Sequence, residues 1–274
     1  MICPDRPGII AALGSFFAER GANIVEAQQH SELGSAKFFC RIEFEPRGAR
    51  AAVLRREFAP VADQFAMEWQ LTFTDRPKRM AVFVSKYDHC LLDLIWRQRA
   101  GEIHAEIPLV ISNHPDLRPI VEGFGIRFEH VPITPETKIA QEQRELALLA
   151  EEQVDFVVLA RYMQVLSPVF LAGYPMRVIN VHHGLLPSFP GARPYEQARE
   201  RGVKVIGATA HYATEELDDG PIIEQDVVPV THRDTVADLV RKGRDVERIV
   251  LARAVRAHAE DRVLLDGRRT VVFA

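Results

Sequence analysis

The sequence has few cysteines and no long apolar run. Its 274 residues contain three cysteines, Cys3, Cys40 and Cys90, which lie far apart and form no Cys-x-x-Cys pair. Neither a disulfide framework nor a zinc site is therefore indicated. No run approaches the roughly 18 apolar residues of a membrane-spanning helix, and no basic, apolar leader opens the chain. These absences predict a cytoplasmic protein that is neither exported nor embedded in a membrane.

The sequence also lacks an excess of positive charge. Lysine and arginine total 34 against 38 aspartate and glutamate, which gives a formal net charge of -4. With this balance the protein has no overall positive potential that would attract nucleic acid or an anionic membrane, so neither is expected as a partner. The hydrophobic fraction of 47% and the charged fraction of 26% are typical of packed globular proteins. The length allows two domains.

The first 74 residues have the periodicities of a small α/β domain. Apolar residues recur at helical spacing over 7–20, between Pro7 and Gly21, and again over 53–65. Residues 36–44 and 67–73 alternate apolar and polar side chains, as half-buried strands do, and "GANIVEAQQH" adds another strand. The predicted order is a stub, helix, strand, strand, helix, strand. The charged segment 75–79 that follows is predicted to be a linker.

From residue 80 to 274 the pattern changes to short apolar strands separated by helices. The predicted strands are "MAVFV", "PLVIS", "RFEHVPI", "DFVVLA", "RVINV", "VIGATAHY" and "IIEQDVVPV". Near-continuous apolar strands that alternate with helices predict a mostly parallel sheet covered on both faces. Ligands of such sheets bind beyond the carboxyl ends of the strands, where Asn180 and His182 follow "RVI". This second domain is therefore the expected site of chemistry.

Three motifs of the second domain resemble a known fold. The segments "LARYMQVLSPVF", "INVHHGLLPSFPGA" and "HYATEELDDGPII" resemble the formyltransferase fold that uses 10-formyltetrahydrofolate, while "CPDRPGI" and "GANI" resemble an ACT regulatory domain. In this order the two resemble the formyltetrahydrofolate deformylase family. The resemblance implies a small ferredoxin-like ACT domain at 1–74 and a Rossmann-like, mostly parallel catalytic domain at 80–274. It departs from the family in one place: only Met1 and Ile2 precede Cys3, so the first ACT strand is expected to be nearly missing.

The family resemblance implies an activity and a set of partners. The activity is hydrolysis of 10-formyltetrahydrofolate to tetrahydrofolate and formate, which supplies formate for purine synthesis and balances the one-carbon folate pools. The folate is the substrate, and no separate cofactor is implied. An amino-acid effector at the ACT domain and a homo-oligomer, a dimer or a tetramer, are further expectations, the latter because an incomplete ACT sheet leaves an exposed edge.

The catalytic residues implied by the resemblance fit the chemistry of formamide hydrolysis. Asn180 matches the family asparagine, whose amide can donate a hydrogen bond to the oxyanion. His182, two residues further along an extended strand, projects to the same side and is the expected proton donor. Asp218 matches the family aspartate and can orient His182, favour its protonated form, and hold or deprotonate the attacking water. The neighbouring Glu215, Glu216 and Asp219 also fit a solvated acidic loop.

Two further sets of residues are implied by the resemblance. One set would line the folate pocket, with main-chain atoms of Gln164 and Leu166 reading the pteridine edge, although Met163 and Val165 equally fit core packing. The other would bind the ACT effector, although Asp5, Arg6 and Gly8 also fit the turn that starts the helix. The folate set is Met163, Gln164, Val165, Leu166, Ala213, Thr214, Glu215, Glu216 and Leu217; the effector set is Asp5, Arg6, Gly8, Asn23 and Ile24.

Alternatives remain at this stage. A metal held by His182, His183 and His211 is disfavoured, because adjacent residues of a strand point to opposite faces. A formyltransferase that acts on a small amine is another alternative, but "VFVSKYDHCLLDLIWRQRA" lacks the glycine-rich turn that cradles phosphate. Lys86, Tyr87, Asp88 and His89 fill that position, either as a plug against a second substrate or as a helix start capped by Asp88. A non-catalytic folate or amino-acid sensor is the third alternative.

Overall fold

The computed structural model describes residues 1–274 except 47, 49–50 and 189–193. The chain forms two compact units. One contains Met1–Arg76, Asp261–Asp266 and Val271–Ala274, and the other contains Pro77–Glu260 and Gly267–Thr270. The boundary between Arg76 and Pro77 lies within the linker predicted at 75–79. The sequence placed all of 80–274 in the second domain, whereas residues 261–266 and 271–274 group with the first unit.

The first unit packs two helices on a small antiparallel sheet. Its strands have the order β1-β3-β2, and its core joins Leu13 and Phe17 of the first helix to Cys40 of β3 and Phe58 of the second helix. A three-residue β1 precedes the first helix. The elements are β1 (Ile2–Pro4), α1 (Ile9–Glu19), β2 (Asn23–Glu32), β3 (Lys37–Glu45) and α2 (Ala51–Phe65).

The strand predicted at 67–73 is wrong. Only Glu68 pairs, in an isolated bridge to Ile2 in which each backbone N–H donates to the other residue's carbonyl at 2.8 Å. The alternation that suggested a strand is real, because Met67, Trp69 and Leu71 pack against the core. A longer strand lacks a partner, since β1 ends at Pro4, whose ring nitrogen carries no N–H. The alternation of apolar residues at 67–73 therefore indicates which side chains are buried, and not that the segment pairs with another strand.

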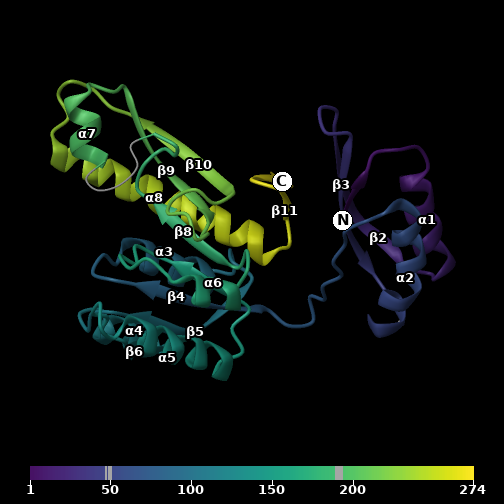
Figure 1. Ribbon diagram of the computed structural model, residues 1–274, viewed down its shortest axis with the longest axis horizontal. Helices are drawn as coiled ribbons and strands as arrows, with labels where there is room; N and C mark the ends of the chain where they lie inside the picture. Colours follow the sequence, from purple (N-terminus) through teal and green to yellow (C-terminus); the bar gives the residue numbers. More distant parts are fainter. Residues whose placement is uncertain (47, 49–50, 189–193) are drawn as a thin grey trace. The chain divides into compact units, whose positions relative to one another are not determined.

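The second unit contains a seven-stranded sheet of order β10-β9-β8-β7-β4-β5-β6 (Figure 1). The strands from β8 through β6 in this order run parallel, whereas β9 is antiparallel to both of its neighbours. All seven strands predicted after residue 79 are confirmed. They are β4 (Lys78–Val84), β5 (Ala105–Ser112), β6 (Arg127–His130), β7 (Phe156–Leu159), β8 (Val178–His182), β9 (Val205–Tyr212) and β10 (Ile222–Pro229).

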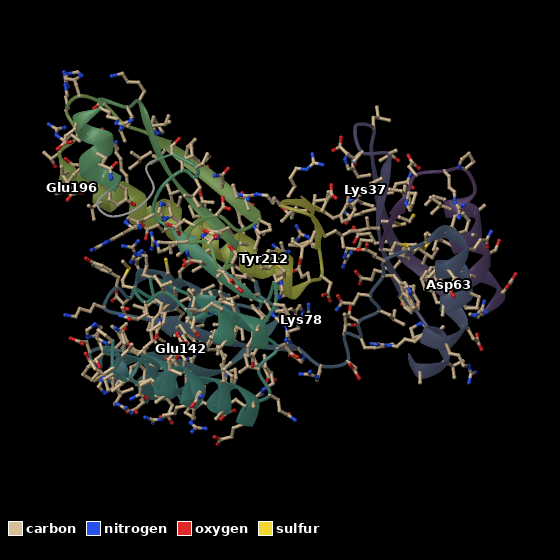
Figure 2. The ribbon with its side chains drawn as sticks, viewed as in Figure 1. Lys37, Asp63, Lys78, Glu142, Glu196 and Tyr212 are labelled. Atoms are coloured by element: carbon tan, nitrogen blue, oxygen red, sulfur yellow. The ribbon has the colours of Figure 1, made fainter. Side chains whose placement is uncertain are left out.

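Helices cover both faces of this sheet, as the burial of successive β4 residues Met80 to Val84 requires. The longest helix, α8, starts with a capping box between Thr235 and Asp238 and packs along β8, β9 and β10. Tyr212 of β9, labelled in Figure 2, contacts it, since its Oη lies 2.9 Å from His258 Nδ1. The helices are α3 (His89–Arg99), α4 (Arg118–Gly123), α5 (Lys138–Glu151), α6 (Pro168–Gly173), α7 (Pro194–Glu200) and α8 (Val236–Ala259).

A hairpin of β11 (Val263–Asp266) and β12 (Arg269–Val272) follows α8. Across the described part of the chain, none of the helices combines the length and the apolar character needed to cross a membrane.

Gly243 lets Tyr195 approach α8 closely. A Cβ at Gly243 would lie 1.9 Å from Tyr195 Oη and 2.3 Å from its Cζ. Gly243→Ala is therefore expected to lower the free energy of unfolding by about 1–3 kcal/mol through overpacking, although alanine normally stabilises a helix interior by about 1 kcal/mol. Urea unfolding of Gly243→Ala in the wild type and in a Tyr195→Ala background checks this. A destabilisation that persists in the Tyr195→Ala background would contradict it.

Candidate active site

Strand β8 carries two polar side chains into the interior. Asn180 and His182 alternate with the apolar residues Ile179 and Val181, so both project from one face of the strand. The antiparallel neighbour β9 places His211 opposite Asn180 and Thr209 opposite His182. Although His182 is only 4% exposed, its ring lies among other polar groups rather than in an apolar core.

Asp218 reaches this cluster from the loop after β9. Its Oδ2 lies 3.1 Å from His182 Nδ1, and its Oδ1 lies 3.7 Å from His211 Nε2. The backbone of Asp218 is left-handed, with φ of 56°, a conformation that aspartate tolerates better than most residues. Burial alone would raise the pKa of Asp218, but the hydrogen bond from His182 and the further interactions with His182 and His211 together outweigh it and hold that pKa well below its ordinary value. Asp218 is therefore a carboxylate at neutral pH.

His211 orients Asn180. Its Nδ1 lies 2.9 Å from the Tyr212 carbonyl, which can only accept, so Nδ1 carries the proton and the neutral ring offers Nε2 as an acceptor. Asn180 Nδ2 lies 3.1 Å from that Nε2. One amide N–H of Asn180 is thus used by His211, and the other can serve a ligand. His211 thus joins the polar cluster, although the sequence analysis did not assign it to the catalytic set.

His182 has one free ring nitrogen. Nδ1 faces the Asp218 carboxylate, and Nε2 is buried without a hydrogen-bond partner in the described structure. A buried polar atom without a partner is uncommon and calls for a ligand, a water or a catalytic role. An imidazole backed by a carboxylate, with its second nitrogen free beside an amide donor, is suited to acid–base chemistry at a carbonyl. The geometry thus brings together Asn180, His182 and Asp218.

Comparison with known proteins relates the chain that carries this site to a family. Residues 78–255 match the family model described as formyl transferase, and residues 1–58 match that of the ACT domain. The formyltetrahydrofolate deformylase of Synechocystis sp. is 54% identical over 274 residues, which cover 99% of this chain and 96% of the relative. The chain belongs to the formyltetrahydrofolate deformylase family. The family resemblance and the fold class expected from the sequence are confirmed.

Solved structures agree with this assignment. The crystal structure of a formyltetrahydrofolate deformylase from Pseudomonas syringae pv. tomato is 49% identical and matches with a TM-score of 0.96, covering 100% of this chain and 92% of the other. A glycinamide ribonucleotide transformylase 1 from Symbiobacterium toebii is 34% identical with a TM-score of 0.69 and covers only 75% of this chain, although 99% of its own. The likeness to the deformylase structure therefore extends over the whole chain, whereas the likeness to the transferase does not.

In this deformylase family member a glycine fixes the loop that carries Asp218. The loop is closed by a 2.9 Å hydrogen bond from Tyr212 N to the Pro221 carbonyl, and a Cβ at Gly220 would lie 1.8 Å from the Tyr212 carbonyl oxygen. A side chain there must displace backbone. Gly220→Ala is expected to reduce kcat by about 10²-fold, because a misplacement of about 1 Å in a catalytic group has that effect. Turnover is compared with that of Gly123→Ala, a site with open space; equal rates would contradict this role.

Thr209 supports the turn that follows β8, and the sequence analysis missed it. Its buried Oγ1 donates to the Gly184 carbonyl at 2.9 Å and accepts from Leu186 N at 3.0 Å and from Gln225 Nε2 at 2.9 Å. The alternation Thr209-x-His211 on a predicted strand is the signal that could have found both residues, because it places them on one face. The sequence does not show that β8 pairs with β9, and this pairing is what places Thr209 opposite His182 and His211 opposite Asn180.

The predicted folate residues lie on two loops after neighbouring strands. Met163 and Val165 are each 57% exposed and Leu217 is 65% exposed. The alternative role of Met163 and Val165 in core packing is therefore wrong. Leu166 is buried in the main core, against which Ala213 also packs. Gln164 and Thr214 are partly buried, whereas Glu215 and Glu216 are exposed.

The predicted effector residues of the first unit are exposed. Gly8 precedes α1 with φ of 94°, a conformation that favours glycine. The Asp5 backbone N–H donates to the Ala36 carbonyl at 2.8 Å, and the Arg6 guanidinium lies 4.6 Å from the centre of the Phe65 ring. These contacts account for Asp5, Arg6 and Gly8 as structural residues of the turn, while Asn23 and Ile24 begin β2.

One group of residues outside the catalytic cluster has the spacing of metal ligands. In the described part of the chain, His89, Cys90 and Glu247 offer ligand atoms within 4.8 Å of one another, whereas the alternative set of His182, His183 and His211 forms no such group. Arg161 Nε lies 3.5 Å from Glu247 Oε2. A guanidinium so close to the carboxylate disfavours a second cation there.

Proposed function

We propose that this chain hydrolyses 10-formyltetrahydrofolate to tetrahydrofolate and formate at Asn180, His182 and Asp218. The observation that carries the proposal is the buried, unpartnered Nε2 of His182, whose other nitrogen faces the Asp218 carboxylate. Family membership supports the reaction, and the geometry supports the residue roles. A sensor without turnover, the alternative function, would not need this arrangement of acid–base groups.

The roles follow from which atoms are free. As water attacks the formyl carbon, His182 Nε2 takes one of its protons, and Asp218 stabilises the positive charge that develops on the ring. The free N–H of Asn180 donates to the oxyanion that forms from the formyl oxygen. The imidazolium then returns the proton to N10 as the C–N10 bond breaks, and formic acid leaves and ionises to formate. Because its pKa is low, Asp218 orients and stabilises rather than removing a proton from water.

Folate recognition uses the two loops with exposed apolar side chains. Met163 and Val165 on one loop and Leu217 on the other provide apolar surface for the pteridine ring. Main-chain atoms of Gln164 and Leu166 read the edge of the ring, and the segment from Ala213 to Leu217 forms the opposite wall. The reaction needs neither a cofactor nor a metal beyond the folate itself.

The proposal extends to regulation and assembly. Strand β2 lies at the edge of its sheet and exposes almost every residue, including the apolar Ile24 and Val25. Such an edge favours pairing with a second copy, so the protein is a homo-oligomer. Its ACT domain binds an amino-acid effector. The free, buried cysteines fit the reducing cytoplasm, where the formate supplies purine synthesis. Light scattering that finds only the 30.9 kDa monomer would contradict the assembly.

Asn180→Ala removes the proposed oxyanion donor. The barrier is expected to rise by about 2.7–4 kcal/mol, which lowers kcat by about 10²- to 10³-fold, with little change in folate affinity. Steady-state kinetics with a separate binding titration checks both values. Gln143→Ala serves as a matched control, because Gln143 is an exposed amide residue of α5 that the mechanism does not use. A rise in KM with kcat unchanged would show instead that Asn180 binds the substrate and the transition state equally.

The reaction itself is tested by formate release from 10-formyltetrahydrofolate in chelator-treated buffer without an acceptor amine. Stoichiometric formate and tetrahydrofolate support hydrolysis. Formylated amine in place of formate, when a mixture of small amines is added, would identify a transferase. Folate binding without any product would identify a sensor.

A further inference from the structure

A second group of polar side chains lies beside the catalytic cluster, and the mechanism does not use it. His183 follows His182, with 5.3 Å between the ring centroids, and lines a cavity of about 170 Å³. The cavity is lined also by Tyr87, His89, Arg161, Arg244 and Glu247. It therefore adjoins the reaction site through two consecutive residues.

Glu247 is the buried anchor of this group. Tyr195 Oη donates to its Oε1 at 2.7 Å and His89 Nε2 lies 2.8 Å from its Oε2. Burial would raise the pKa of Glu247, but the hydrogen bond from His89 and the charge of Arg161 together lower it. The carboxylate is thus ionised and its oxygens are already hydrogen-bonded, so it holds the walls of the cavity in place.

Arg161 brings an incompletely satisfied positive charge to the cavity. Its side chain is 11% exposed, and its Nε is buried without a hydrogen bond, although it lies 3.5 Å from Glu247 Oε2. Its backbone is left-handed, with φ of 62°, a conformation that costs a non-glycine residue energy and often marks a functional position. Arg161 follows β7 and precedes the loop at Met163 that is proposed to bind folate.

A second guanidinium faces the same cavity. Arg161 and Arg244 each place Cζ 5.3 Å from the centre of the Tyr87 ring. In the described structure no carboxylate pairs with Arg244, whereas Glu196 at the rim and Glu247 are the acidic groups of the lining. Burial and then the charge of Arg161 lower the pKa of His183 to about 4, against the opposing charge of Glu247, so His183 is neutral at neutral pH.

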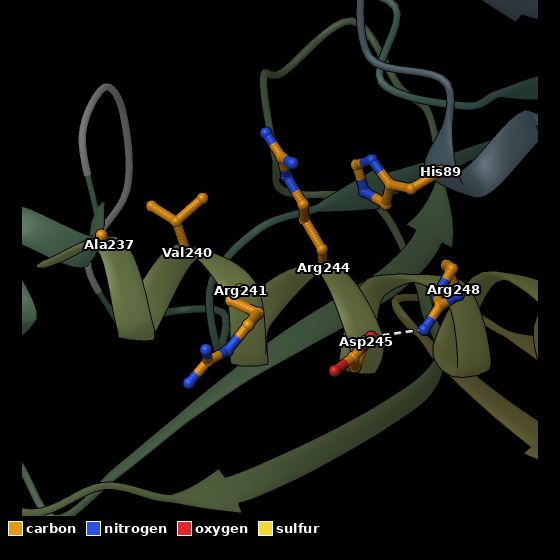
Figure 3. Close-up of a pocket in the computed structure, with 7 residues that line it drawn as sticks. All are labelled: His89, Ala237, Val240, Arg241, Arg244, Asp245 and Arg248. Atoms are coloured by element: carbon orange, nitrogen blue, oxygen red, sulfur yellow. Dashed lines mark hydrogen bonds and ion pairs between the residues drawn. The ribbon is translucent and has the colours of Figure 1, made fainter. Parts of the chain in front are cut away.

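The cavity shares part of its lining with a larger cavity that is basic. The outer cavity, of about 380 Å³, shares His89, Val240 and Arg244 with the inner one (Figure 3). Arg241 and Arg248 also line it, but they pair with Asp238 and Asp245 respectively. Arg161 and Arg244 are thus the guanidinium groups of the inner lining, and Arg244 belongs to the lining of both cavities.

We infer that the inner cavity is a binding site for a small carboxylate, and that its occupant is the formate that the proposed hydrolysis produces. The inference rests on the proposed function. Guanidinium groups bind carboxylates through paired, charge-assisted hydrogen bonds, and the neutral His183 can add a further one. Formate is small enough for the space and is released next to it. Arg161 and Arg244 therefore draw the product away from His182 and empty the site for the next water.

Titration of the folate-free protein with ¹³C-formate, followed by the broadening of the formate signal, tests this site without turnover. We expect saturable binding to the wild type, at least tenfold weaker binding to Arg161→Gln, and no change in Arg253→Gln, an arginine of α8 that pairs with Asp226 outside both cavities. Product inhibition of hydrolysis by formate is expected to weaken by the same factor in Arg161→Gln. Equal formate affinity and equal inhibition in Arg161→Gln and the wild type would overturn the inference.

Two controls keep the outcomes distinct. Circular dichroism and thermal melting show whether Arg161→Gln is folded; if it is not, Arg244→Gln replaces it with the same expected loss. A wild type that releases formate but binds none overturns this inference alone. A wild type that releases no formate overturns the proposed function instead.

Discussion

Replacing His182 by alanine is expected to lower the rate of formate release by about 10²- to 10⁴-fold, the usual contribution of a positioned acid–base group. The reason is that Nε2, the free buried nitrogen of the cluster, both receives the proton of water and returns it to N10. The affinity for the folate is expected to change little, since the exposed apolar loops bind the ring. Single-turnover kinetics, which separate chemistry from product release, give the cleanest measurement.

His232→Ala is the matched control, because His232 is an exposed histidine outside the cluster. Its rate is expected to equal that of the wild type. Formate release by His182→Ala at the rate of His232→Ala would remove His182 from the mechanism. A loss of rate that accompanies a loss of folded structure is recognised from the melting curve, and His182→Gln, which keeps a polar group of similar size, then replaces the alanine variant.

Asp218→Asn is expected to have an effect on the order of 10⁴-fold, the loss known when the carboxylate partner of a catalytic histidine becomes an amide. An amide N–H at this position can donate to His182 Nδ1, so the ring proton moves to Nε2, and that nitrogen can no longer accept a proton from water. Asp218→Glu, which keeps the charge but shifts it by a methylene, is expected to retain more activity. Equal activity of Asp218→Asn and the wild type would contradict the role.

The pH profile gives Asp218 a second test. Its pKa is held well below its ordinary value of 3.8 in the folded protein, so the carboxylate stays ionised at every pH above about 4. A depressed pKa means that the stability contributed by Asp218 is fully present above 3.8 and is lost only as the pH falls below it. We therefore expect the acid limb of kcat/KM between pH 5 and 8 to come from another group. Titration of Asp218 within that range, seen by NMR, would contradict the geometry.

The sequence predicted the second unit better than the first because its strands are buried on both faces. Near-continuous apolar strands such as "MAVFV" cannot lie on a surface, and all seven of them form one sheet. The alternation at 67–73 was a weaker signal. It reports which side chains are buried, whereas a strand also needs a partner, and a β1 of only three residues cannot pair along its length.

The family resemblance favoured Asp218 over its neighbour Asp219. The structure turns the Asp218 carboxylate to His182, while Asp219 pairs with Arg268. Asp88 shows the opposite. It occupies the position before α3, as predicted, but its side chain makes no capping hydrogen bond, and its neighbour His89 bonds to Glu247 instead.

Partners brought together by folding could not be found in the sequence. His89 and Glu247 are 158 residues apart, and Tyr195 and Glu247 are 52 apart, yet one carboxylate joins all three. Gly243, in the interior of a long helix, was the sole local sign of this contact, since glycine there costs helix stability unless something packs against it. Register across β8 and β9 likewise decides that His211 faces Asn180.

The central claim is that water is the formyl acceptor at this site, and a single turnover in H₂¹⁸O tests it most directly. The account predicts formate that carries one ¹⁸O atom and unlabelled tetrahydrofolate, at a rate that falls in His182→Ala. Formate without label, or a formyl group transferred to any other acceptor at the rate of turnover, would contradict it.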